Sequence, residues 1–351
     1  MMLSRPTFRS EVGTKLGIVS STVICRANTR LSLRGDPYRP VSNCENGYQR
    51  ADIATTASGS SLPLHRRLPA RSWDGHMHVV EPDRYQISPS AVYKPEAHSL
   101  VEALAFESSL GLENLVLVQP SIYGTDNSCL LAALKQLGPS RGRGVVVVDP
   151  AAVHSDMLDE WHALGVRGIR VNLQSVGKVM DQYELETILL RHAEIARPRN
   201  WIVELYIPMA MMPLVESVAP QLGVRLCIDH FGSPRLPDHS RASEDPDFDP
   251  YSIPGFRSLI SLLRAGETYV KLSAPYRLSK DENMRHLEAL AREFLTIAPD
   301  RVIFATDWPH TRFYGLDISP FTEWCLDLCA QEPELVEKIF RHNTEQMLGV
   351  C

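Results

Sequence analysis

Short apolar runs alternate with amphipathic stretches from Arg71 to the end of the chain. Each apolar run is rich in Val, Ile and Leu and is followed by turn residues, a pattern typical of buried parallel strands. We expect eight strands, over Ser72–Val79, Asn114–Pro120, Gly144–Pro150, Val166–Leu173, Trp201–Ile207, Val224–Gly232, Thr268–Ala274 and Arg301–Trp308.

Helical periodicity fills the segments between these runs. Asp126 and Asp281 stand where helix N-caps are expected, and Gly138, Gly223 and Gly266 stand where helices should end. We expect helices over Glu96–Leu112, Asp126–Leu137, His154–Leu164, Asp181–Ala196, Met209–Leu222, Pro254–Ala265, Asp281–Ile297, Ser319–Ala330 and Pro333–Leu348.

An unbroken series of strand–helix units predicts either a parallel barrel or a large doubly wound sheet. The chain has no GxGxxG after its first strand and no Walker-type loop, so a nucleotide-binding fold has no positive support. Eight units match the count of a (β/α)₈ barrel. We therefore predict an α/β protein, a TIM barrel over residues 71–351 with an N-terminal extension over residues 1–70.

The predicted extension differs in composition from the rest of the chain. Up to Gly35 it holds six Lys and Arg residues and one acid, Glu11, with frequent serines. This composition resembles a mitochondrial transit peptide, and the alternative is a plain disordered tail. Residues 36–70 are rich in Pro, Ser, Asn and Arg and are interpreted as a linker. Seven scattered cysteines favour a reducing compartment, so we expect a cytoplasmic location, with the mitochondrion as the alternative.

Charge and hydropathy exclude two classes of partner. The formal net charge is −6, which does not suit a nucleic-acid-binding protein. No apolar run approaches the roughly 20 residues that span a bilayer. We therefore expect a small-molecule ligand, and the sequence does not indicate an oligomeric state.

Polar residues with catalytic chemistry follow three of the predicted strands. His76 and His78 end the first strand, His230 ends the sixth and Asp307 ends the eighth. Side chains alternate along a strand, so His76 and His78 should share a face, whereas Asp229 should point away from His230 and be structural. Active sites of such barrels lie at the carboxyl ends of the strands, where the first and eighth strands are neighbours. We expect these three histidines and Asp307 to meet there.

The segments Asp74–His78, Ile228–Gly232 and Ala305–His310 together resemble the amidohydrolase superfamily, in its amidohydrolase-2 branch. Within that branch the chain is most similar to 2-pyrone-4,6-dicarboxylate lactonases. The residues around Gln119–Asn127, Gly165–Arg170 and Lys271–Ser279 support the likeness, which covers about Ser72 to Leu348.

The resemblance implies a hydrolase that opens a lactone or similar ester of a small carboxylic acid. Asp307 would activate water as a general base, while His76, His78 and His230 polarise the carbonyl. The setting would be the catabolism of aromatic compounds or secondary metabolism.

The resemblance also implies a set of substrate-binding residues. Arg170 and Arg277 match substrate-binding arginines, and a guanidinium suits a carboxylate ligand. Ser121 and Tyr206 match positions that contact the substrate. Lys178 is the nearest substitute for an arginine that is absent after the fourth strand. Because another arginine after the sixth strand is also displaced, we expect a substrate with fewer negative charges than the dicarboxylate.

The same residues leave a metal site and two other functions open. His76, His78, His230 and Asp307 are of ligand types that zinc accepts. The fifth strand lacks a histidine, and the lactonase branch works without metal, so we favour a site with no metal and keep zinc as the alternative. A zinc-dependent decarboxylase of an aromatic or unsaturated acid is the first rival function. A non-catalytic barrel that serves as a binding protein is the second.

Overall fold

The computed structural model describes residues 62–175, 177, 180–237, 248–329 and 332–350. Residues 1–61, which hold most of the predicted extension with its transit peptide, lie outside the described residues. The segment from 62 to 70 is described and begins the compact unit that runs to the end of the chain. Its short 3-10 helix η1 (Leu64–Arg66) packs beside α1. Leu64 and the nearby Leu68 contact the hydrophobic core.

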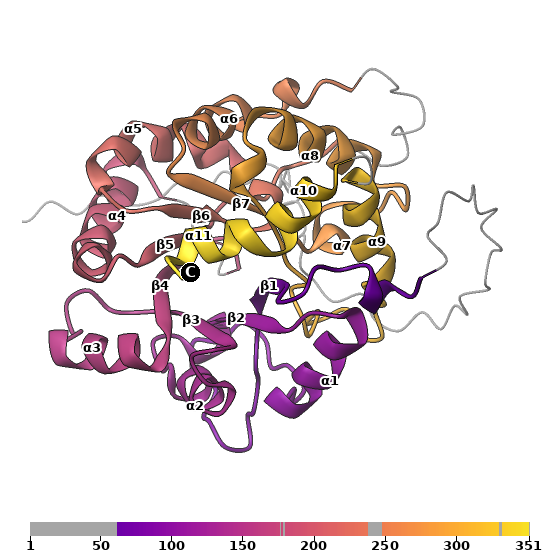
Figure 1. Cartoon of the computed structure of the whole chain (residues 1–351). Coiled ribbons are helices and arrows are strands. Elements are labelled where there is room, and N and C mark those ends of the chain that lie inside the picture. The colour runs from indigo at the N-terminus through magenta and orange to yellow at the C-terminus, as the bar shows by residue number, and fades with distance from the viewer. Residues whose placement is uncertain (1–61, 176, 178–179, 238–247, 330–331, 351) are drawn as a thin grey trace, which may run out of the picture. The chain divides into compact units, whose positions relative to one another are not determined.

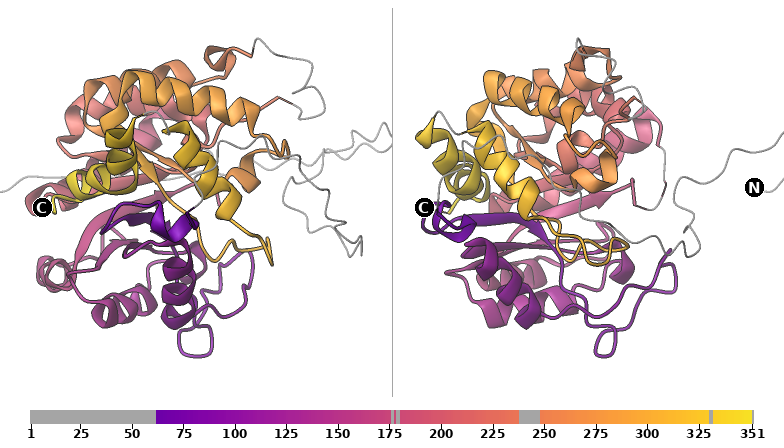
Figure 2. Two further views of the ribbon diagram at one scale, coloured as in Figure 1. Left: turned by 45° about the vertical axis from the view of Figure 1, so that its right-hand side comes forward. Right: turned by 90° about the vertical axis from the view of Figure 1, so that its right-hand side faces the viewer.

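Eight parallel strands follow in the order of the sequence, each paired with the next. Backbone hydrogen bonds from His78 N to Trp308 O (2.8 Å) and from Asp307 N to His76 O (2.9 Å) join the eighth strand to the first. The predicted (β/α)₈ barrel is confirmed, and Figures 1 and 2 show the strands at the centre with helices outside them. The strands are β1 (Trp73–Met77), β2 (Asn114–Val118), β3 (Gly142–Val146), β4 (Val166–Asn172), β5 (Ile202–Tyr206), β6 (Leu226–Ile228), β7 (Thr268–Leu272) and β8 (Val302–Phe304).

The helices lie where the periodicity predicts them, although most begin later than predicted, by four residues for α1 and α8. Ser99 and Glu102 form a capping box, so α1 begins after Ser99 rather than at Glu96. The Asp281 carboxylate accepts the N–H of Arg285, where α8 begins. The helices are α1 (Leu100–Leu110), α2 (Ser128–Leu137), α3 (Ser155–Leu164), α4 (Gln182–Ala196), α5 (Met212–Leu222), α6 (Phe256–Ala265), α7 (Pro275–Leu278), α8 (Arg285–Ile297), α9 (Ser319–Leu328), α10 (Pro333–Glu337) and α11 (Asn343–Leu348), with a π turn, η9 (Lys338–His342), between the last two.

The strands end earlier than the sequence predicts, and the difference is four residues for β6 and β8, which both lead into site residues. Regular pairing of β6 stops at Ile228, and regular pairing of β8 stops at Phe304. His230, Phe231 and Asp307 then take positive φ angles of 51°, 54° and 60°. This left-handed region is sparsely populated by residues other than glycine. The chain therefore leaves the regular strand alternation at the points where its functional side chains emerge.

The last helix of the chain closes the end of the barrel at which the strands begin. Trp73, Val116 and Tyr269 belong to a buried cluster that also contains Met347 and Leu348 from α11. In Figure 1 the yellow helices α10 and α11 cross in front of the strands. Burying such side chains contributes about 1.5–3 kcal/mol each to folding. This arrangement leaves the opposite end, where the strands finish, for the site.

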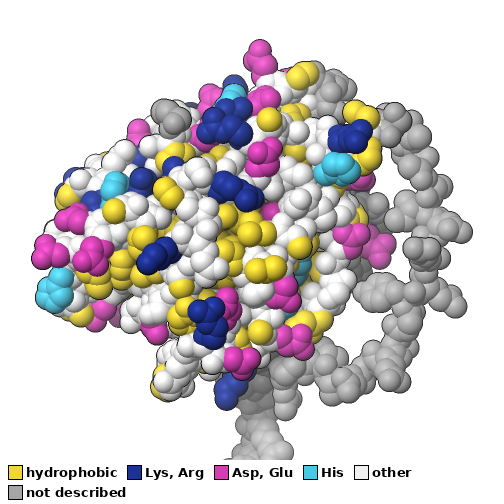
Figure 3. Space-filling view, turned by 60° about the horizontal axis from the view of Figure 1, so that its bottom comes forward, with side chains coloured by type: hydrophobic (Ala, Val, Ile, Leu, Met, Phe, Trp, Pro, Cys, Tyr) yellow, Lys and Arg dark blue, Asp and Glu magenta, His cyan; other side chains and the backbone are white. Residues whose placement is uncertain are grey.

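The surface of the barrel shows both signs of charge. On the face drawn in Figure 3, Lys and Arg side chains are interspersed with Asp and Glu side chains and with small hydrophobic areas. Among the described residues, no helix combines the length and apolar character that crossing a bilayer requires.

Candidate active site

The carboxylate of Asp74 ties β1 to the segment after β8. Its Oδ1 accepts the backbone N–H groups of His76 and Thr306, both at 2.9 Å, and its Oδ2 accepts the Thr306 hydroxyl at 2.5 Å. Asp74 is fully buried. These bonds hold His76 and the neighbouring Asp307 in a common frame, although the two lie far apart in sequence.

Asp307 is the point at which the three predicted histidines meet. Its Oδ1 lies 3.7 Å from Nε2 of His76, 3.6 Å from Nε2 of His78 and 3.9 Å from Nε2 of His230. The structure therefore brings together the four residues that the sequence indicated. Their catalytic roles stay predictions.

The second carboxylate oxygen of Asp307 is held by α7. Tyr276 donates its hydroxyl to Oδ2 at 2.7 Å, and Arg277 donates Nε–H to the same atom at 2.8 Å. Burial would raise the pKa of Asp307, but the charge of Arg277, with a further contribution from His230, holds this pKa well below its usual range. Asp307 is therefore a carboxylate at neutral pH, with Oδ1 directed at the histidines.

Each of the three imidazoles has its Nδ1 occupied. His78 Nδ1 lies 2.7 Å from the carbonyl of Val118, which can only accept, so His78 donates there. His230 Nδ1 lies 2.7 Å from the Ser273 hydroxyl, and His76 Nδ1 lies 3.0 Å from Lys271 Nζ. Burial lowers the pKa of His230 to about 4 and that of His76 well below its usual value. These two rings are therefore neutral at physiological pH.

A buried network of charges lies beneath the histidines. Lys271 Nζ is 2.5 Å from Glu204 Oε2 and 3.1 Å from Asp229 Oδ1, and Arg170 Nη2 is 3.0 Å from Asp229 Oδ2. All four side chains are nearly inaccessible to solvent. Burial opposes the charge on Lys271, but the two carboxylates outweigh it and raise its pKa. Two cations thus balance two anions within the barrel.

The expectation that Asp229 points away from His230 is wrong. Its Oδ1 lies 3.2 Å from His76 Nδ1 inside the barrel. The reason is the end of β6 at Ile228, after which the left-handed backbone of His230 breaks the alternation. Both side chains therefore reach the interior.

The predicted substrate-binding residues occupy different settings. Arg170 is buried, with Asp229 and the carbonyl of Gln119 as partners, whereas the side chain of Arg277 is 17% exposed. The ring of Tyr206, at the end of β5, packs edge-on against His230 at 4.7 Å between centroids. Ser121 begins the short helix η2 (Ser121–Tyr123), at the same end of the barrel. Lys178 lies outside the described residues.

Sequence reasoning missed Glu204, Lys271 and Tyr276. Glu204 and Lys271 sit in the middle of the apolar strands β5 and β7, where side chains are buried. A buried charge is costly unless it is paired, so two opposite charges inside core strands were a signal of an internal network. Tyr276 carried no such signal, since only the geometry of α7 brings it to Asp307.

Two groups of side chains have a spacing that suits a metal ion. One atom each of His76, His230 and Asp307 lies within 4.8 Å of the others, and the same holds for His76, Glu204 and Asp229. In the second group Lys271 Nζ already contacts all three residues. The residues of the first group are ligand types that zinc accepts.

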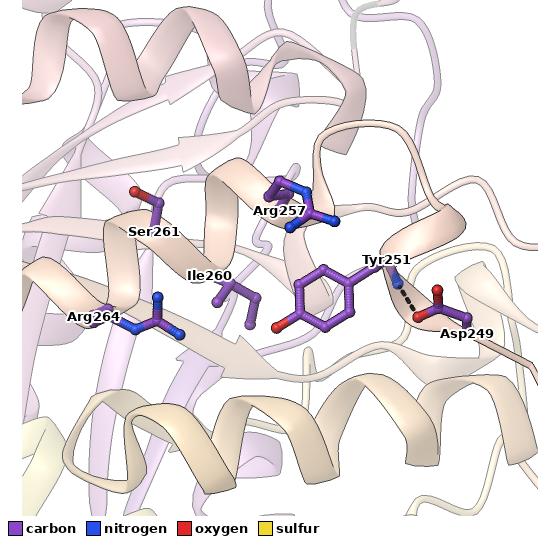
Figure 4. Close-up of a pocket in the computed structure, with 6 residues that line it drawn as sticks. All are labelled: Asp249, Tyr251, Arg257, Ile260, Ser261 and Arg264. Carbon is purple, nitrogen blue, oxygen red and sulfur yellow. Dashed lines mark hydrogen bonds between the residues drawn. The ribbon is translucent and has the colours of Figure 1, made fainter.

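A groove of about 310 Å³ lies apart from this cluster, on the outer side of α6 (Figure 4). It is lined by Asp249, Tyr251, Arg257, Ile260, Ser261 and Arg264. The guanidinium of Arg257 lies over the Tyr251 ring, 5.0 Å from its centroid. The lining includes no histidine and none of the residues that surround Asp307, so we assign the chemistry to the barrel end.

Two curated relatives are named as hydrolases, one of a muconolactone and one of a pyrone dicarboxylate. The chain is 30% identical over 295 residues to 4-sulfomuconolactone hydrolase of Hydrogenophaga intermedia, which covers 82% of this chain and 91% of the relative. It is 28% identical over 255 residues to 2-pyrone-4,6-dicarboxylate hydrolase of Comamonas testosteroni, with 70% and 78% covered.

A solved structure of similar description shares the barrel. It is an Acinetobacter baumannii protein, described as a "probable" 2-pyrone-4,6-dicarboxylic acid hydrolase with citric acid bound, at 25% identity. The TM-score is 0.61, and the match covers 80% of this chain and 99% of that one. A family model described as amidohydrolase matches residues 73–350, which include every strand and each of the four clustered residues. With that match across the whole barrel, the chain belongs to the amidohydrolase family.

Proposed function

We propose that this enzyme hydrolyses a lactone of a small carboxylic acid by water attack, with Asp307 as the general base. The single observation that carries the proposal is that the two carboxylate oxygens of Asp307 have different neighbours. Its Oδ2 accepts two hydrogen bonds from α7, while its Oδ1 faces three Nε2 atoms at 3.6–3.9 Å. A base held in this way keeps one oxygen aimed at the space between the histidines.

A water molecule fits the chemistry of Asp307 and His78. His78 donates from Nδ1, and the tautomer with its only proton there presents a lone pair at Nε2, 3.6 Å from Asp307 Oδ1. Two acceptors at this separation suit a water that donates one proton to each. As the water oxygen attacks the lactone carbonyl, its proton passes to Asp307.

The carbonyl oxygen becomes negative during the attack and needs donors. His76 Nε2 is buried and has no hydrogen-bond partner in the described structure. We place the carbonyl oxygen against this atom, where an N–H stabilises the tetrahedral oxyanion. Collapse breaks the bond between the acyl carbon and the ring oxygen, and Asp307 returns its proton to that oxygen. The product is an opened hydroxy or keto acid.

The charges around the site favour a substrate with few negative groups. The charge of Arg170 is matched by Asp229 and Glu204, and only Arg277 of the two predicted arginines is partly exposed. Arg277 retains donors beyond its Nε bond to Asp307, and these suit one carboxylate. The names of the two curated relatives support a lactone substrate in general, although the dicarboxylate and the sulfonated lactone in those names carry more acidic groups than the substrate proposed here.

Ring opening by the full chain tests the proposal. Ultraviolet absorbance would follow 2-pyrone-4,6-dicarboxylate, 4-sulfomuconolactone and a lactone with a single carboxylate, each with and without a strong chelator. We expect opening of at least one lactone, unaffected by the chelator and lost in Asp307→Asn. Release of CO₂ from an unsaturated acid, dependent on added zinc, would instead support the decarboxylase.

A further inference from the structure

Lys271 occupies an unusual position for a lysine, on the core strand β7 with no exposed surface. Its ammonium lies 2.5 Å from Glu204 Oε2, 3.0 Å from His76 Nδ1 and 3.1 Å from Asp229 Oδ1. An ammonium has three N–H donors and no acceptor. The three neighbours therefore match its donors one for one.

The contact with Lys271 determines which nitrogen of His76 carries the proton. Because the ammonium cannot accept, Nδ1 of His76 must be the acceptor of this hydrogen bond. Asp229 Oδ1, 3.2 Å from the same nitrogen, is the neighbour that would favour a proton on Nδ1, but the ammonium of Lys271 lies closer to Nδ1, at 3.0 Å, and also contacts this carboxylate oxygen. A neutral imidazole has one N–H, which must then lie on Nε2, the atom that faces Asp307.

We propose that Lys271 is a positioning residue that fixes the His76 proton on Nε2, so that the site presents a hydrogen-bond donor instead of a metal ligand. The inference deepens the proposed lactone hydrolysis, because that N–H is the donor placed against the carbonyl oxygen. Its test needs no substrate, so it stands or fails separately from the choice of lactone.

The donor set around Asp307 does not fit a metal in this state. A histidine that binds zinc through Nε2 offers a lone pair there and donates its Nδ1–H to a carboxylate, carbonyl or water. His76 shows the reverse arrangement, with a cation at Nδ1. In the deeper group of His76, Glu204 and Asp229, the ammonium itself takes the central position. Lys271 thus places a positive charge against His76, the residue common to both groups.

Nitrogen-15 NMR of the full chain reads the His76 proton directly. Long-range proton–nitrogen spectra distinguish a protonated from a bare ring nitrogen, and the signals are assigned by their loss in His76→Gln. We expect the protonated nitrogen of His76 to be Nε2 in the wild type. A proton on Nδ1 of His76 in the wild type would overturn the proposal.

A second experiment tests whether the site gains affinity for zinc when Lys271 is replaced. Lys271→Met combined with Glu204→Gln removes one charge of each sign, leaving Arg170 paired with Asp229, so the buried network stays neutral. Asp229 then becomes the remaining polar neighbour of His76 Nδ1, which favours a proton on Nδ1 and a bare Nε2. We expect zinc to bind about 10- to 100-fold more tightly than to the wild type, measured by calorimetry.

Glu204→Gln alone is the matched control, because it keeps Lys271 and its bond to His76. This variant should retain the wild-type proton position and gain no zinc affinity. Tight stoichiometric zinc binding by the wild type would contradict the proposal, as would a double variant that folds by circular dichroism and shows unchanged zinc affinity.

Discussion

Arg277 donates its Nε–H to Oδ2 of Asp307 at 2.8 Å, across the gap between α7 and the end of β8. Tyr276 donates to the same oxygen, so that oxygen is already engaged before any substrate binds. The resemblance to lactonases assigned Arg277 to the substrate. The ion pair supports an additional role, in which Arg277 orients the base and lowers its pKa.

Replacing Arg277 by Met separates these two roles. Burial would then act on Asp307 without its main opposing charge, so the pKa of Asp307 should rise. The acid limb of kcat/KM moves to higher pH, and kcat falls by about 10- to 100-fold at neutral pH. Tyr276→Phe, which removes a hydrogen bond without a charge, should shift the limb less. An increase in KM with an unmoved acid limb would show that Arg277 serves the substrate alone.

Asp307→Asn should abolish turnover while the fold is retained. The amide keeps the size and one acceptor oxygen but cannot take a proton, which removes a contribution of about 10²–10⁴ to the rate. Circular dichroism and thermal unfolding check the fold, and Asp327→Asn, an exposed residue on α9, is the control. A rate near that of the wild type would disprove the mechanism.

The fold was readable from the sequence because each strand and helix repeats a simple period. Glycines at the helix ends, such as Gly223 and Gly266, carry positive φ angles in the structure as their positions suggested. The strand ends were not readable in the same way. Val224–Gly232 is apolar enough to continue a strand, and only the left-handed turn at His230 and Phe231 ends it.

Part of the candidate site could also be predicted from the sequence. Barrel topology alone predicts that His76, His230 and Asp307 converge, since all three lie at the carboxyl ends of strands or just after them. It does not predict the hydrogen-bond partners of each ring. The pairing of Lys271 with Glu204 depends on the register of three strands, β5 to β7, and register is set by packing that a single sequence does not reveal.

Gly75→Ala should damage both stability and activity. A Cβ at this position would lie 2.6 Å from Ile303 Cγ2 and 2.8 Å from the backbone oxygen of Phe304. Since β8 cannot yield without moving its neighbours, we expect a loss of about 1–3 kcal/mol in the free energy of unfolding. Urea titration measures it. Gly144→Ala, whose nearest contacts are the flexible methyl groups of Leu134 and Leu130, should cost less.

His310 offers a test of how burial couples to pH. Its ring is 4% exposed and packs edge-on against Phe106 and Tyr276. Burial lowers its pKa to about 4, although the Asp307 carboxylate acts in the opposite direction. The unfolded chain binds a proton near pH 6.5, whereas the folded chain does so only near pH 4. The stability linked to this ring is therefore present above pH 6.5 and is lost as the pH falls toward 4.

His310→Phe removes this dependence while keeping an aromatic ring in the pocket. Between pH 7 and pH 4 the wild type should lose about 3 kcal/mol more of its unfolding free energy than the variant does. Burial lowers the pKa of His230 to about 4 and raises the pKa of Glu204, and these two shifts change the stability with opposite signs. Both groups are present in the two proteins, so the difference between the proteins isolates His310.

Urea unfolding across this pH range provides the measurement. The exposed His342 gives the control variant His342→Phe, for which the change of unfolding free energy with pH should follow that of the wild type. Equal slopes for wild type and His310→Phe would mean that His310 is not kept neutral by its burial.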